Sequence, residues 1–201
     1  MKKLLFMSLI GLGLITACKK SATTSTVNQY GTSVNATEKI LALPIFDPVD
    51  QEEHVARTRG YEFKSSVNGR ITYLGARTQP GIYTVSLWDS SAQSLIKSVN
   101  VTVPDSSVFS YVDIDDVSIT ANKVYVVAIN STPVASLTNN QTIFFTITLP
   151  ANYLPRTVDN ITYVASVEKI TSSATSLFPY SYEPEPDVIM GLPSFKFEPV
   201  I

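Results

Sequence analysis

The stretch Ile82–Trp88, IYTVSLW, decides the fold class because its side chains alternate in character. Tyr83, Val85 and Leu87 fall on one face of an extended chain, whereas Trp88 falls on the more polar face. A period of two residues is typical of a β-strand with one buried face. The stretch therefore predicts a strand whose Tyr83 face joins a hydrophobic core.

Similar short stretches recur along the chain, separated by turn signals such as Asn-Gly and Pro-Gly. Val, Ile, Thr, Tyr and Phe are frequent in them, and no stretch after the first 17 residues has helical periodicity over three turns. About nine or ten strands at this spacing predict an all-β fold, a single antiparallel β-sandwich or jelly-roll-like domain. The predicted strands are 61–64, 70–76, 82–88, 94–103, 108–114, 117–119, 124–129, 141–149, 161–170 and 194–200.

For two of these strands the sequence also predicts a position within a sheet. The stretch 124–129, VYVVAI, is apolar on both faces, which is typical of a central strand that is covered on both sides. The closing strand 194–200 is expected to pair near the first strand and so to seal a sheet edge.

The first 17 residues have the character of a secretory signal. MKK supplies two positive charges, and the 14 residues 4–17 carry none, whereas a membrane-spanning helix needs about 20. The run ends in Ile15-Thr16-Ala17-Cys18, which resembles the bacterial lipobox. The resemblance implies cleavage before Cys18, alkylation of its thiol with diacylglycerol, and acylation of the new amino terminus, for instance with palmitate. An ordinary signal with a chance cysteine, or a buried core cysteine, is the alternative.

Lipidation would place the protein in the cell envelope, on the outer membrane or cell surface, with the membrane as its partner. Cys18 is the only cysteine, so no disulfide can form within the mature chain. Residues 18–37 are rich in Ser, Thr and Asn, which predicts a lipidated terminus followed by a flexible tether. The β-sandwich domain is then expected over 38–201.

Composition disfavours several functions. Losing Lys2 and Lys3 leaves 13 basic against 17 acidic residues, a net charge of −4, with no basic stripe to bind nucleic acid. His54 is the only histidine, which disfavours a zinc site and a Ser-His-Asp triad. We therefore expect a protein that is not an enzyme and uses no cofactor. A hydrolase with two facing carboxylates stays as a further hypothesis.

A longer pattern extends through 60–129. It comprises Gly69-Arg70-Ile71, then Gly81 followed by Leu87-Trp88-Asp89, then Leu95-Ile96, and finally ITANKVYVV over 119–127. This pattern resembles the uncharacterised bacterial domain family DUF4082, with Asn122 in place of a usual glycine. The resemblance implies a β-sandwich module of extracellular proteins, often found beside carbohydrate-active or adhesion modules. It implies no catalytic residues.

Aromatic side chains are the candidate ligand-binding residues. Trp88, on a polar strand face, could stack on a sugar ring. The stretch 177–186, LFPYSYEPEP, has three prolines that would hold Tyr180 and Tyr182 in a stiff loop. Packing of these aromatics on the sandwich is the alternative for both places.

Three acidic residues are weak candidates for calcium ligands: Asp113, Asp115 and Asp116. A solvated strand face explains them as well.

Taken together, the sequence predicts a membrane-anchored, non-enzymatic module that binds a glycan or a surface protein. The alternative is a structural or adhesin-type subunit, or a spacer, of a surface assembly.

Overall fold

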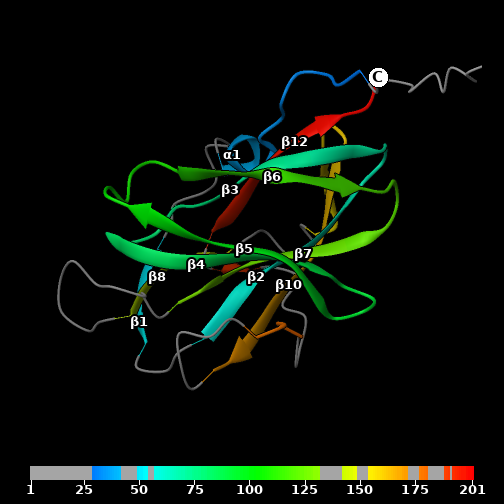
Figure 1. Ribbon diagram of the computed structural model, residues 1–201. Coiled ribbons are helices and arrows are strands. Elements are labelled where there is room, and N and C mark those ends of the chain that lie inside the picture. The colour runs from blue at the N-terminus through cyan, green and yellow to red at the C-terminus, as the bar shows by residue number, and fades with distance from the viewer. Residues whose placement is uncertain are drawn as a thin grey trace, which may run out of the picture.

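A computed structural model describes residues 29–41, 49–53, 57–131, 142–148, 154–171, 177–180, 188–190 and 192–201. Within them the chain is almost entirely β-structure (Figure 1). The elements are α1 (Ala36–Leu41), β1 (Val49–Glu53), β2 (Arg57–Ser65), β3 (Gly69–Ala76), β4 (Gly81–Asp89), β5 (Ser94–Val103), β6 (Ser110–Ile119), β7 (Val124–Asn130), β8 (Thr142–Thr148), β9 (Arg156–Val158), β10 (Ile161–Ile170), β11 (Val188–Met190) and β12 (Pro193–Pro199). No helix in these ranges has the length and apolar character needed to cross a membrane.

Two antiparallel sheets pack against each other and confirm the predicted all-β sandwich. The larger sheet has the strand order β5-β4-β7-β2-β10-β9, and the smaller has the order β12-β3-β6 (Figure 1). A third, three-stranded sheet has the order β1-β8-β11. β7 lies between β4 and β2, which confirms the central position predicted from its two apolar faces.

The two predicted strands 108–114 and 117–119 are one strand, β6. β3 pairs with both parts: Ile71 lies opposite Val117, and Tyr73 lies opposite Asp113. The register shift between these pairs absorbs the extra residues as a bulge, so the ladder continues through it. The sequence suggested a break because the alternation of apolar and polar residues changes phase at Asp115 and Asp116.

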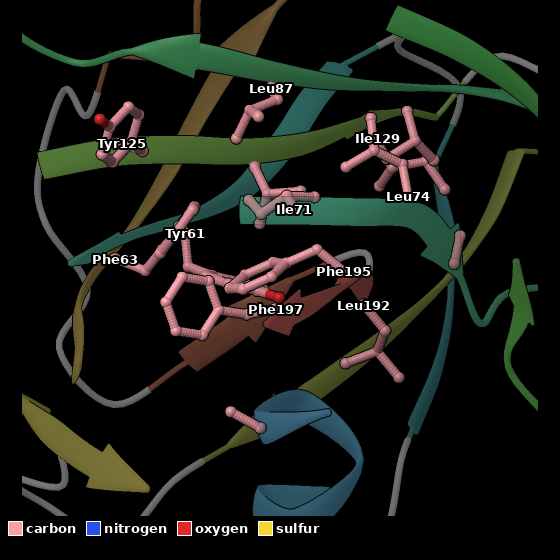
Figure 2. Close-up of a cluster of buried hydrophobic side chains, with 14 of the residues drawn as sticks. Tyr61, Phe63, Ile71, Leu74, Leu87, Tyr125, Ile129, Leu192, Phe195 and Phe197 are labelled. Atoms are coloured by element: carbon pink, nitrogen blue, oxygen red, sulfur yellow. The ribbon is translucent and has the colours of Figure 1, made fainter. Parts of the chain in front are cut away.

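The core lies between the larger sheet and the smaller sheet (Figure 2). Phe63 of β2 stacks on Phe195 of β12 with ring centroids 4.3 Å apart, and on Tyr125 of β7 at 5.8 Å. It therefore joins the larger sheet to the smaller one. The largest fully buried side chains are Tyr61, Tyr163, Phe63, Phe195, Phe197, Ile71, Leu74, Leu87 and Ile129.

The closing strand pairs differently from the prediction. β12 pairs with β3 and lies at the end of its sheet, so the expected pairing near the first strand is wrong. Residues 29–34 contact β12 through backbone hydrogen bonds. Gly31 N donates to Pro199 O at 2.8 Å, and Val34 exchanges bonds with Phe197 at 2.7 and 3.0 Å. A segment that precedes every predicted strand therefore protects this edge.

We call residues 29–41 the strap, because they bind the body of the domain. Asn35 Oδ1 accepts the backbone N–H of Glu38 at 3.1 Å, which caps α1. Tyr111 OH donates to Glu38 Oε1 at 2.8 Å and connects this cap to β6. The strap therefore extends over β12 and is attached at α1 to the smaller sheet.

Thr37 of the strap is buried between two tyrosines. Its Oγ1 lies 2.8 Å from Tyr61 OH and 2.9 Å from Tyr163 OH, and Tyr61 OH donates to Pro193 O at 2.7 Å. Burial raises the pKa of both tyrosines, so their hydroxyls stay protonated and available to Thr37.

Residues that precede the predicted boundary at residue 38 contact the body of the domain. Low hydrophobicity suggested a tether over 18–37. Residues 29–37 instead contact the body through backbone hydrogen bonds, through the Thr37 hydroxyl, and through Val34 and Ala36, which pack with the core. The rest of the predicted tether, 18–28, lies outside the described residues.

Replacing Thr37 with valine is expected to lower the free energy of unfolding by about 2 kcal/mol, because two buried hydrogen bonds of about 1 kcal/mol each are lost. Urea denaturation of the full-length protein measures this change. Thr157→Val is the control: its Oγ1 lies 2.9 Å from Thr162 Oγ1 in an exposed pair, and about 0.5 kcal/mol or less is expected. Equal effects of the two substitutions would contradict the structural role of Thr37.

Candidate ligand-binding groove

A second apolar cluster lies on the face of the larger sheet that points away from the core. It contains Trp88, Val126, Ala128 and Val167, with Phe178 packed against it. Side chains alternate along β7, so Val126 and Ala128 join this cluster while their neighbours join the core. The segment 177–180 thereby has an apolar surface on which to pack.

Trp88 lies beneath that segment. Its side chain is only 7% exposed, and its ring meets Phe178 edge-on with centroids 5.8 Å apart. Its indole nitrogen is buried and has no hydrogen-bond partner among the described residues. Trp88 is therefore placed to support Phe178, and its ring face is not open to a ligand, in line with the packing alternative.

Tyr180 has the exposure that Trp88 lacks. It is 46% exposed, and the ammonium of Lys169 lies 4.5 Å from its ring centroid. Pro179 precedes it and restricts the backbone. Tyr182, the other predicted aromatic, lies outside the described residues.

Tyr180 lines two cavities. The larger of these two, a groove of about 450 Å³, is called the main cavity below. Its walls come from β2, the β4–β5 turn, β10 and the segment 177–180. The lining residues are Glu62, Ser90, Gln93, Ala165, Val167, Phe178, Pro179 and Tyr180. The lining thus combines apolar and aromatic side chains with a few polar groups, as small-molecule sites usually do.

The polar part of the lining is fixed by the β4–β5 turn. Asp89 accepts hydrogen bonds from Ser91 Oγ at 2.8 Å and Ala92 N at 3.0 Å, and pairs with Lys123 Nζ at 2.5 Å. The hydrogen bond from Lys123 is the main cause of the lowered pKa of Asp89. Ser90 Oγ then donates to Glu62 Oε1 at 2.7 Å, so both groups are already oriented.

A smaller cavity of about 240 Å³ is lined by Glu168, Lys169, Ile170 and Tyr180. Both oxygens of Glu168 are engaged: Oε1 accepts from Arg57 at 2.9 Å and Oε2 from Arg59 at 3.1 Å. Tyr180 lines this cavity as well as the main one. The exposed ring of Tyr180 is therefore shared by two cavities.

The three calcium candidates do not converge. Asp115 pairs with Lys97 at 2.8 Å, a hydrogen bond that lowers its pKa, and Asp116 pairs with Arg70. Asp113 lies opposite Tyr73 in the β3–β6 ladder. In the described part of the chain, no three acidic, histidine or cysteine side chains are grouped as a metal ion would require.

Of the residues that line the groove, the sequence predicted Tyr180. Trp88, the other described candidate, lies nearby and packs against Phe178 of the groove lining. The sequence did not identify Glu62, Ser90, Gln93 or Lys169, which carry no motif and come from β2, the β4–β5 turn and β10. Cys18 and His54 lie outside the described residues.

Comparison of the chain with models of known protein families finds no match, and comparison with curated proteins finds no relative. The resemblance to DUF4082 therefore stays a prediction.

Proposed function

We propose that this protein is a lipid-anchored module of the cell envelope that binds a glycan without catalysing a reaction. The single observation that supports glycan binding most strongly is the exposed Tyr180 at the edge of the main cavity. The apolar face of a sugar ring stacks on an aromatic side chain, while its hydroxyls need polar partners. Glu62, Ser90 and Gln93 offer such partners across the groove.

Binding without catalysis is proposed from the acids of the groove. Glycoside hydrolysis usually needs two carboxylates about 5 to 10 Å apart on either side of the scissile bond. Among the described residues that line the main cavity, Glu62 is the one carboxylate, and it already accepts a hydrogen bond from Ser90. This arrangement suits recognition of a hydroxyl better than acid–base chemistry.

Tyr180→Ala is expected to weaken glycan binding about tenfold or more, which corresponds to about 1.4 kcal/mol of lost stacking. The full-length protein is first tested on a glycan array, and calorimetry with the retained glycan then compares the variants. Tyr73→Ala is the matched control, because Tyr73 also has an ammonium over its ring, that of Lys196 at 4.5 Å, but lies on the smaller sheet. Retention of no glycan by the wild type would overturn the proposal.

A subunit of a surface assembly is a second candidate, supported by β5. Among the residues that the structure describes, this strand is the end strand of the larger sheet. Its Leu95 and Ile96 are 51% and 38% exposed. An exposed edge with apolar side chains is suited to pairing with a strand of another chain. Light scattering of the purified protein distinguishes the candidates: concentration-dependent oligomers favour assembly, and a monomer opposes it.

A further inference from the structure

We infer that the main cavity and the smaller cavity form one extended site for an oligosaccharide, with an acidic sugar residue beside Lys169. This inference rests on the proposed glycan-binding function and specifies its ligand class. It starts from Tyr180, which lines both cavities. A linear glycan that passes this ring would place sugar units on each side of it.

The two cavities differ in their chemistry. The main cavity offers a hydroxyl, an amide and a carboxylate, namely Ser90, Gln93 and Glu62, which suit the hydroxyls of a neutral sugar. The smaller cavity offers the side chain of Ile170, which is 61% exposed, and the charged groups of Glu168 and Lys169. An apolar surface beside a charge suits a sugar ring that carries a charged substituent.

The sign of that charge follows from the ion pairs. Glu168 cannot readily pair with a cationic ligand, because Arg57 and Arg59 already occupy its two oxygens. Lys169, by contrast, contacts the ring of Tyr180 and pairs with no acidic side chain among the described residues. A ligand carboxylate would therefore find a charge-assisted partner in the Lys169 ammonium.

The register places Lys169 on the same face of β10 as two residues that line the main cavity. In the β10–β2 ladder Lys169 lies opposite Thr58, while Val167 lies opposite Gly60 and Ala165 opposite Glu62. Ala165, Val167 and Lys169 are alternate residues of one strand, so they line one face from the main cavity toward the smaller one. The row forms a floor that continues beneath both cavities.

The experiment uses linear galacturonic acid oligosaccharides of one to six units and their methyl-esterified counterparts, in which each carboxylate is replaced by an uncharged methyl ester. Calorimetry with the full-length protein measures both series at low and high salt. The acid form is expected to bind at least tenfold more tightly at low salt, and affinity should rise with length beyond one unit. High salt should reduce this preference, because it screens the Lys169 interaction.

Lys169→Gln should abolish the preference for the acid form and leave binding of the methyl ester unchanged within twofold. Lys64→Gln is the matched control: Lys64 belongs to β2, opposite Thr162, and lines neither cavity. Thermal unfolding verifies that each variant is folded.

The outcomes separate this inference from the proposed function. Equal affinity of the wild type for acid and ester, or a preference that survives Lys169→Gln, overturns the acidic subsite while glycan binding stands. Affinity that does not rise beyond one unit overturns the extended site. Binding of uncharged glycans alone overturns the acidic subsite as well, and retention of no glycan on the array overturns both proposals.

Discussion

Cys18→Ser is expected to move the full-length protein from the membrane fraction to the soluble fraction. In the proposed function the Cys18 thiol carries diacylglycerol, and serine cannot form that thioether. Each buried CH₂ contributes roughly 0.8 kcal/mol, and stable anchoring takes at least two chains, so losing them removes nearly all membrane affinity. Fractionation followed by detection of the protein, with labelling by a fatty-acid analogue, measures the change.

The control for this experiment is Lys20→Ser, which changes a neighbouring residue and keeps the thiol. It should stay in the membrane fraction and keep the fatty-acid label. Membrane retention of the Cys18→Ser variant would mean that the lipobox interpretation is wrong.

An anchor at Cys18 would also keep the groove near the lipid. Residues 29–41 bind the body, so ten residues, 19–28, separate Cys18 from the strap. Ten residues span at most about 36 Å when fully extended. The structure thus shortens the tether that the sequence predicted and limits how far the domain could move from the membrane.

Phe63→Ala is expected to lower the free energy of unfolding by about 4 kcal/mol, a large part of the 5–15 kcal/mol typical of a domain. Phe63 is fully buried, and its ring stacks on Phe195 across the two sheets and on Tyr125 within the larger one. Alanine removes both ring contacts and leaves a cavity at the sheet interface. Chemical denaturation of the full-length protein measures the loss.

Two further substitutions test why Phe63 matters. Phe63→Leu keeps most of the volume and should cost less than half as much. Phe109→Ala removes a ring that is only partly buried against the core, and about 1 kcal/mol is expected. If Phe63→Ala were no more destabilising than Phe109→Ala, Phe63 would not be the link between the sheets.

The sequence predicted the longer strands of the two packed sheets because each carries its own signal, and it missed β1, β9 and β11, which have three to five residues. The bounds of β5, 94–103, were predicted to the residue, and β7 was predicted as a central strand from VYVVAI. Errors arose where the signal is not local. The bulge in β6 disturbs the alternation, yet pairing with β3 continues across it. The strap has few apolar residues, and its binding depends on tyrosine hydroxyls more than 20 residues away.

The groove was predictable only in part. Tyr180 stood out as an aromatic residue between prolines. The opposite wall did not, since Glu62 and Ser90 are 28 residues apart and meet only because β2 and the β4–β5 turn converge. Trp88 appeared exposed from strand alternation, but the segment 177–180 covers it.

By itself, then, the sequence determined most of the strands and that the result is an antiparallel sandwich. It did not predict the short strands β1, β9 and β11. The properties that it determined follow from the alternation of neighbouring residues, and hydrophobic burial acts on that pattern wherever the strand lies. Only the tertiary structure decided that β12 pairs with β3, that Thr37 bridges two tyrosines, and that Tyr180 lines two cavities. Such features depend on which distant segments contact one another, and these contacts cannot be predicted from any short stretch of sequence.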